Sequence, residues 1–305
     1  MVLRYSLASA ATQTERVRQT VALLRRRGYA LTARRLGELC LGGRLTEGQV
    51  RWAVAAGADL AMAGNLVVDR SDLRRADDIN RRGVDHAKEA RGYLEMTIAF
   101  IHKLVALAPF IRGVSIAGSL ASGGFRASDD VDLNLIVEDG HRHLAYVAVN
   151  ALGLAHAMRH RGKPVDDLTR RPLAPRLMTA NLILERSQCL PLARQDEDMA
   201  FELLVAEPVF GLGAIAELID ANPALLEYFP QLAVKPAPLA IEAPHGRLPS
   251  ALFPSVLDGA ARVLGENAWR YMQWTRRNRP EALARVAFVR STMRPYALFD
   301  GQGSD

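Results

Sequence analysis

Cysteine and long apolar runs are scarce in this sequence. The two cysteines, Cys40 and Cys189, stand far apart and have no Cys-x-x-Cys or Cys/His spacing around them. This argues against a disulfide scaffold and against structural zinc. No run reaches the roughly 20 apolar residues of a membrane span, and the first residues lack an apolar stretch followed by a cleavage site. We therefore expect a cytoplasmic protein without a membrane partner.

Lysine is the other scarce residue: four lysines stand against 35 arginines, in a chain of formal net charge +6. Arginine offers a planar fork that pairs bidentately with phosphate, so the excess indicates a polyanionic substrate or a nucleic-acid partner. A second explanation fits equally well, because GC-rich genomes encode proteins that are rich in alanine and arginine and poor in lysine. The composition leaves both open.

The length of 305 residues and the content of 49% hydrophobic and 24% charged residues predict a folded chain of two or three structural units. Apolar spacing predicts a first helix over 14–27, a second from Thr32 to about residue 41, and a third over 47–56 that Thr46 caps. Two short strands between 60 and 68, turned at Gly64-Asn65, would follow. Helix, helix, helix, hairpin is the order of a winged helix.

A winged helix that binds DNA needs polar side chains on the helix that enters the major groove. In the 47–56 segment, Gln49 and Arg51 are suitable, whereas the rest, including Trp52, suits packing. We therefore expect this unit to serve as a docking module more readily than as a DNA reader.

Beyond residue 70 the pattern predicts an α+β protein: a small mixed sheet flanked by helices, and then a helical C-terminal region. We expect three domains: a winged-helix-like unit over 1–75, a core over 76–205 and the helical region over 206–305. The expected elements are a connector at 70–82, a helix at 85–107, strands at 114–117 and 131–137, a helix at 143–160, a strand at 177–184, helices at 198–206, 212–219, 253–276 and 280–293, and a proline-rich linker at 234–244.

The segment 115–137 carries the chemistry. Its first strand ends at Gly118-Ser119, where a residue without a side chain lets a ligand approach the backbone and where a hydroxyl can hold phosphate oxygens. On the next strand Asp130 and Asp132 are two residues apart, so both carboxylates point to one face. Two adjacent carboxylates repel each other unless a cation lies between them, and Mg²⁺ is the usual cation for such ligands. Asp129 has the other parity and is interpreted as a solvated turn residue.

Gly-Ser, a ten-residue spacer and Asp-x-Asp on an apolar strand resemble the signature of the nucleotidyltransferase fold superfamily, which includes DNA polymerase β, CCA-adding enzymes and antibiotic nucleotidyltransferases. The resemblance implies that Gly118 and Ser119 contact nucleotide phosphates and that Asp130 and Asp132 bind Mg²⁺ or Mn²⁺. It also implies transfer of a nucleoside monophosphate from a triphosphate such as ATP to a small molecule, an RNA or a protein. A looser likeness links the whole chain to uncharacterised bacterial proteins that join a winged helix to a nucleotidyltransferase domain.

One feature departs from that pattern. Active members often carry a third carboxylate on a later strand, where this chain offers Asn181 at the matching position and Glu185 four residues further on. We take Asn181 as the third catalytic residue, because its oxygen can accept a hydrogen bond although it cannot take a proton. The alternative is an inactive, nucleotide-sensing regulator whose winged helix binds DNA or a protein.

Further residues are candidates for the nucleotide site: Gly123, Arg126 and Ser128, all in the turn before the carboxylates. Four histidines invite a metal interpretation, but without a glutamate in an H-E-x-x-H arrangement we expect them to be exposed; they are His141, His143, His156 and His160. The segment 269–277 mixes aromatics with arginines, which is typical either of a packed helix with a basic end or of a surface that stacks nucleobases or single-stranded RNA.

Overall fold

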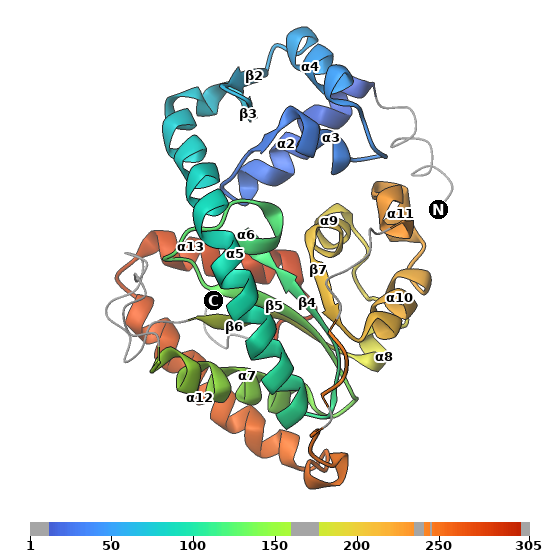
Figure 1. Ribbon diagram of the computed structural model, residues 1–305, viewed down its shortest axis with the longest axis vertical. Helices are drawn as coiled ribbons and strands as arrows, with labels where there is room; N and C mark the ends of the chain where they lie inside the picture. Colours follow the sequence, from blue (N-terminus) through green and yellow to red (C-terminus); the bar gives the residue numbers. More distant parts are fainter. Residues whose placement is uncertain (1–11, 160–176, 235–240, 245, 300–305) are drawn as a thin grey trace, which may run out of the picture.

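The computed structural model describes residues 12–159, 177–234, 241–244 and 246–299 (Figure 1). Within them lie two sheets, one of three strands near the start of the chain and one of four strands in the middle, and helices flank both. The mixed α/β class expected from the sequence is confirmed.

The N-terminal unit combines three helices with the three-stranded sheet. Thr32 and Thr46 cap the second and third helices as expected, each through a hydrogen bond to a backbone amide. The strands run in the order β1-β3-β2, all antiparallel. The elements are α2 (Gln13–Arg26), β1 (Leu31–Thr32), α3 (Ala33–Glu38), α4 (Glu47–Ala56), β2 (Leu60–Ala63) and β3 (Leu66–Asp69).

The next helix begins earlier than the sequence indicated. A short 3₁₀ helix, Arg70–Arg75, leads directly into α5, Ala76–Leu107, so the stretch expected to be a connector is helical. Charges of both signs resembled a linker, but Asp77 and Asp78 fall in the first turn of α5, where acidic side chains favour a helix start. In Figure 1, α5 extends from the N-terminal unit along the central sheet.

The four-stranded sheet has the order β6-β5-β4-β7. β4 pairs antiparallel with β5 and β7, whereas β5 and β6 are parallel and are joined through α7, the crossover that parallel strands require. β5 has the bounds that the sequence analysis expected, 131–137. The elements are β4 (Ile111–Ala117), α6 (Gly118–Ser122), β5 (Val131–Val137), α7 (Arg142–Ala157), β6 (Met178–Glu185) and β7 (Glu207–Phe210).

β7 lies where the sequence analysis expected only helices. Its four residues include Pro208, and so short a run has no usable alternation. Proline is tolerated there because β7 is an edge strand, so its missing amide removes no ladder bond on the outer side. The central sheet therefore extends past residue 205.

Helices cover both faces of this sheet. Val131, Leu133 and Leu135 pack in one core with α5 and α7, whereas Ile136 belongs to a second core with α9 and the N-terminal unit. α12 packs on the outer side of α7, and α13 returns to the face of α9. The remaining helices are α8 (Arg186–Cys189), α9 (Glu197–Val205), α10 (Leu212–Asp220), α11 (Ala224–Tyr228), two 3₁₀ helices (Pro230–Ala233 and Ser250–Leu252), α12 (Leu257–Arg276) and α13 (Pro280–Met293).

None of the helices in the described part of the chain is both long and apolar enough to cross a membrane. The proline-rich linker expected at 234–244 falls largely outside the described residues, as does His160.

Candidate active site

The end of β4 lies directly against the second carboxylate. Gly118 has φ +62°, a left-handed conformation that glycine adopts without penalty. A Cβ atom placed on Gly118 would lie 2.1 Å from Oδ2 of Asp132, which is far inside van der Waals contact. The backbone at Gly118 and the carboxylate of Asp132 can therefore be neighbours only because this position has no side chain.

Asp132 alternates along β5 with the packed Val131 and Leu133, and Asp130 comes directly before the strand. The hydroxyl of Thr179, on the paired strand β6, donates to Oδ1 of Asp132 at 3.0 Å. Burial raises the pKa of Asp132 to about 6, and the negative charge of Asp130 adds to the rise. The two carboxylates are thus close enough to repel each other, which is the arrangement that a divalent cation relieves.

Ser119 contacts Asp129, the acid that comes before the Asp-x-Asp pair. Its hydroxyl donates to Oδ2 of Asp129 at 3.2 Å, and the same oxygen accepts the backbone amide of Arg126 at 3.1 Å. Asp129 is buried and pairs with Arg82 of α5 at 3.4 Å. The interpretation of Asp129 as a solvated turn residue was wrong, because strand parity does not apply to a residue that precedes β5 and bends back toward α6.

The three candidates in the turn have structural contacts of their own. Gly123 ends α6 in the left-handed conformation at φ +100°. The guanidinium of Arg126 pairs with Asp78 of α5 at 2.9 Å. Ser128 is half-buried in the turn just before Asp129.

Asn181 belongs to a buried amide–carboxylate network. Its Nδ2 donates to Oδ1 of Asn134 at 3.0 Å and to Oε1 of Glu202 at 2.9 Å, and Asn134 donates to the same Glu202 oxygen at 3.2 Å. Burial raises the pKa of Glu202, although the charge of Arg27 and the two amides oppose the rise. A third carboxylate therefore lies on this face, and it comes from helix α9.

Sequence reasoning missed Glu202 because it searched the strands. The available signal was a single acid inside the apolar run of α9, a position that is buried only when the acid has partners. Glu185 is at the far end of β6, where it accepts the amide of Gly140 at 2.9 Å. A bulge at Asn181 also ends the strand parity that was assumed to link the two residues.

Three side chains link the N-terminal unit to this site, one from α5 and two from the N-terminal unit itself. Arg82 donates to the carbonyl of Gly28 at 2.9 Å while it pairs with Asp129. The ring of Tyr29 lies against Gly124, and its pKa is raised to about 12 by burial. Arg27 stacks on Phe201 of α9, one residue before Glu202.

The three histidines of this group that the structure describes are packed, contrary to expectation. His141 is buried and stacks on Phe110 with centroids 5.1 Å apart, and its two ring nitrogens contact the backbone carbonyls of Asp139 and Phe253. His143 pairs with Asp258 at 2.7 Å, and His156 packs edge-on against Phe100.

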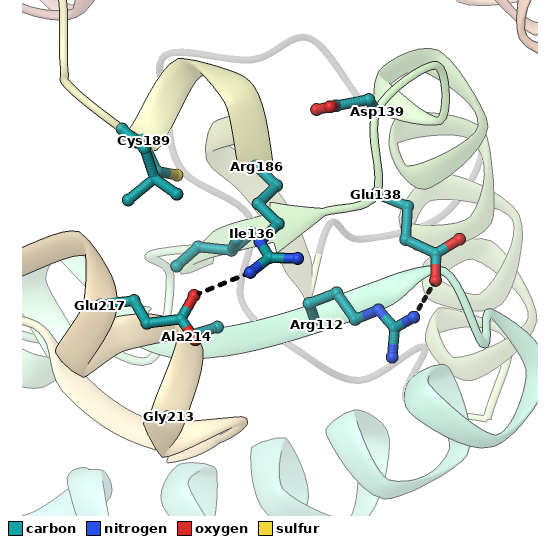
Figure 2. A pocket seen from close by; sticks show the side chains of 10 residues that line it. Arg112, Ile136, Glu138, Asp139, Arg186, Cys189, Gly213, Ala214 and Glu217 are labelled. Carbon is teal, nitrogen blue, oxygen red and sulfur yellow. Dashed lines mark hydrogen bonds and ion pairs between the residues drawn. The ribbon is translucent and has the colours of Figure 1, made fainter.

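A cavity of about 550 Å³ lies on the same side of the sheet but at the opposite end of β5 from the carboxylates. Figure 2 shows Arg112 and Arg186 at its rim, each paired with a glutamate, Glu138 and Glu217 respectively. Cys189 lines it, and burial raises the pKa of that thiol to about 12. None of Asp130, Asp132 and Glu202 lines this cavity.

Among the described residues, no three or more His, Cys, Asp or Glu side chains form a group that could hold a metal ion. Asp130 and Asp132 offer carboxylate oxygens of the kind that a divalent cation binds, but they do not make up a full set of ligands.

Comparison with known proteins adds no identification: no protein-family model, no curated protein and no solved structure matches this chain.

Proposed function

We propose that the chain is a metal-dependent nucleotidyltransferase, in which a winged-helix-like N-terminal unit is joined to a nucleotidyltransferase-like core. The observation that carries the proposal is the close approach of the Gly118 backbone to Asp132, with Asp130 beside it. A bend without a side chain gives a triphosphate access to the paired acids.

The reaction would move a nucleoside monophosphate. An acceptor atom forms a bond to the α-phosphorus of the triphosphate, while the bond from that phosphorus to the bridging oxygen breaks and pyrophosphate leaves. A divalent cation, when bound, neutralises charge on the phosphates and lowers the pKa of an acceptor hydroxyl. Asp130 and Asp132 would hold it, and the sequence resemblance assigns them that role.

The remaining site residues would position groups around this centre. Because the Ser119 hydroxyl donates to Asp129, it can bind a phosphate oxygen only after turning away from that acid. Both hydrogens of the Asn181 amide point to Glu202 and Asn134, which fixes its oxygen as an acceptor for a nearby hydroxyl. Glu202 is thus a positioning residue for Asn181.

The test is release of pyrophosphate. The purified chain is incubated with labelled ATP or another triphosphate, Mg²⁺ and a panel of small-molecule, RNA and protein acceptors. Asp132→Asn should lower the rate by at least about a hundredfold, because charge stabilisation of this kind contributes several kcal/mol to the barrier. Asp220→Asn, an exposed acid at the end of α10, is the matched control and should leave the rate unchanged. Equal rates in both variants would refute the proposal.

A second candidate, a nucleotide-sensing regulator without turnover, is favoured by the link from the N-terminal unit to the turn before β5 through Arg82. Its DNA-binding form receives little support from α4, since Gln49 is used in the helix cap and Arg51 pairs with Glu47. Trp52, which was expected to pack, is 61% exposed and would suit a protein partner. Salt-sensitive binding of duplex DNA that survives Asp132→Asn would favour the DNA-binding regulator instead.

A further inference from the structure

The helical pair α12 and α13 is one of the basic parts of the chain. Between residues 257 and 299 eight arginines stand against three acids, a net charge of +5. Residues 12 to 44 are also basic, with eight arginines against two acids. A clustered basic region on a helical pair is typical of a surface that contacts phosphates.

Exposed aromatic rings lie within this region. Tyr271 and Trp274 are each 58% exposed, and their rings stack with centroids 6.2 Å apart and planes inclined by 25°. The guanidinium of Arg277 lies over the Trp274 ring, 4.3 Å from its centroid. Their spacing of three residues puts all three side chains on one face of the end of α12. We call these three residues the α12 platform.

The packed part of the same helix is separate from the platform. Trp269 is half-buried, and its ring centroid lies 6.4 Å from that of Phe299. The first part of the 269–277 segment therefore packs, as one of the two interpretations of its sequence expected. The helix therefore presents two aromatic groups, one that packs inward and one that faces solvent. Exposed aromatic rings flanked by arginine offer stacking positions for unpaired bases.

α13 connects the platform to the part of the molecule that holds the carboxylates. It begins at Pro280, just after the turn that follows Arg277. α13 packs against α9, the helix that carries Glu202, and α9 also packs against α6, which begins at Gly118. The face of the sheet that holds Asp132 is therefore next to the helix that follows the platform.

From this arrangement we infer that the acceptor of the proposed reaction is the end of a single-stranded RNA, with its bases on the α12 platform and its terminal hydroxyl beside Asp130 and Asp132. This inference rests on the proposed nucleotidyltransferase function. Duplexes fit less well, because their bases are already stacked and cannot lie on aromatic side chains.

Binding is measured apart from catalysis. The full chain is titrated into a fluorescein-labelled single-stranded RNA of about 15 nucleotides, and fluorescence anisotropy reports the affinity. Trp274→Ala should weaken binding at least about fivefold, the lower bound for one stacked base. Trp52→Ala, which removes an equally exposed tryptophan from α4, should leave the affinity unchanged. Arg277→Gln should reduce the slope of log affinity against log salt by about 0.7, the value for one phosphate contact.

Extension of the RNA is then followed on a denaturing gel with labelled ATP and Mg²⁺. We expect Trp274→Ala to raise the KM for RNA and to leave the KM for ATP unchanged. Asp132→Asn should bind the RNA and fail to extend it.

The outcomes separate the two proposals. RNA binding that depends on Trp274, together with no release of pyrophosphate from the triphosphate in the presence of any acceptor, would refute the proposed function and, with it, the assignment of RNA as acceptor. Pyrophosphate release with a small molecule, together with equal RNA binding by the Trp274 and Trp52 variants, would overturn the RNA inference alone. Concentration-dependent dimerisation lost in Trp274→Ala would also overturn it, because the platform would then be an interface between copies of this chain.

Discussion

Removing the charge of Asp132 should stabilise the metal-free protein. Burial and the neighbouring Asp130 raise the pKa of Asp132 from its usual 3.8 to about 6. At a cost of 1.36 kcal/mol per unit, the ionised side chain destabilises the folded state by up to about 3 kcal/mol at neutral pH. Asparagine carries no charge and can still accept the hydroxyl of Thr179.

The direction in which stability changes with pH follows from the protons that the folded and the unfolded chain bind. Below about pH 3, Asp132 is largely protonated in both the folded and the unfolded chain, so its raised pKa costs almost nothing. As the pH rises toward 6, the unfolded chain loses this proton first, and the free energy of unfolding falls until Asp132 is ionised in the folded state as well. The penalty is then constant above about pH 7.

The assay is thermal unfolding of Asp132→Asn and of the unaltered protein in EDTA, at several values of pH. At pH 7.5 the variant should melt about 6 °C higher, taking about 2 °C per kcal/mol for a chain of this size. The gap should shrink toward zero near pH 3. Asp129→Asn is the contrasting control and should lower the melting temperature, because it breaks the ion pair with Arg82. An Asp132→Asn protein that melts below the unaltered one at pH 7.5, or a gap that persists at pH 3, would refute the reasoning.

Three further predictions concern neighbouring positions. Gly118→Ala should lower both triphosphate affinity, measured by calorimetry, and melting temperature, because its Cβ would meet Asp132 at 2.1 Å; an unchanged affinity would contradict the site. Arg82→Gln should lower the free energy of unfolding in a denaturant titration by about 1–2 kcal/mol, because it removes a charged hydrogen bond and an ion pair. Arg91→Gln is the control on the same helix: its side chain is 90% exposed, so the substitution should cost almost nothing. Cys189, whose pKa is about 12, should resist alkylation at pH 8 until the protein is unfolded, as peptide mapping would show.

The sequence predicted best the elements that carry a local signal of their own, such as an apolar face that packs on neighbouring helices or a proline at a helix start. β5 matches its expected bounds because valine and leucine alternate with polar residues over its first half, and one face packs on α5 and α7. α13 also matches, since Pro280 marks its start. β7 was missed because an edge strand of four residues is defined by its pairing with β4, which a local pattern does not contain.

A local sequence pattern can place residues on a strand, but not residues that depend on packing between distant segments. Asp132 lies on β5, where period-two alternation applies, whereas Asp130 precedes the strand, and the joint metal-binding role of the two acids stays a prediction. Glu202 and Asp129 are of the second kind, since each becomes significant only through its partners: two asparagines from different strands for Glu202, and Arg82 with Ser119 for Asp129. The sequence analysis treated the chain as successive modules, and these contacts cross the module boundaries.

The bridge made by Arg82 has a practical consequence for dissecting this molecule. One guanidinium nitrogen donates to the carbonyl of Gly28 and another pairs with Asp129, so a single side chain of α5 links the turn after α2 to the turn before β5. A shortened protein starting at Ala76 would keep all four strands of the central sheet but would lose half of that bridge and uncover Gly124, which Tyr29 now shields. Fragments therefore report poorly on the intact chain, and work on its chemistry is best done at full length.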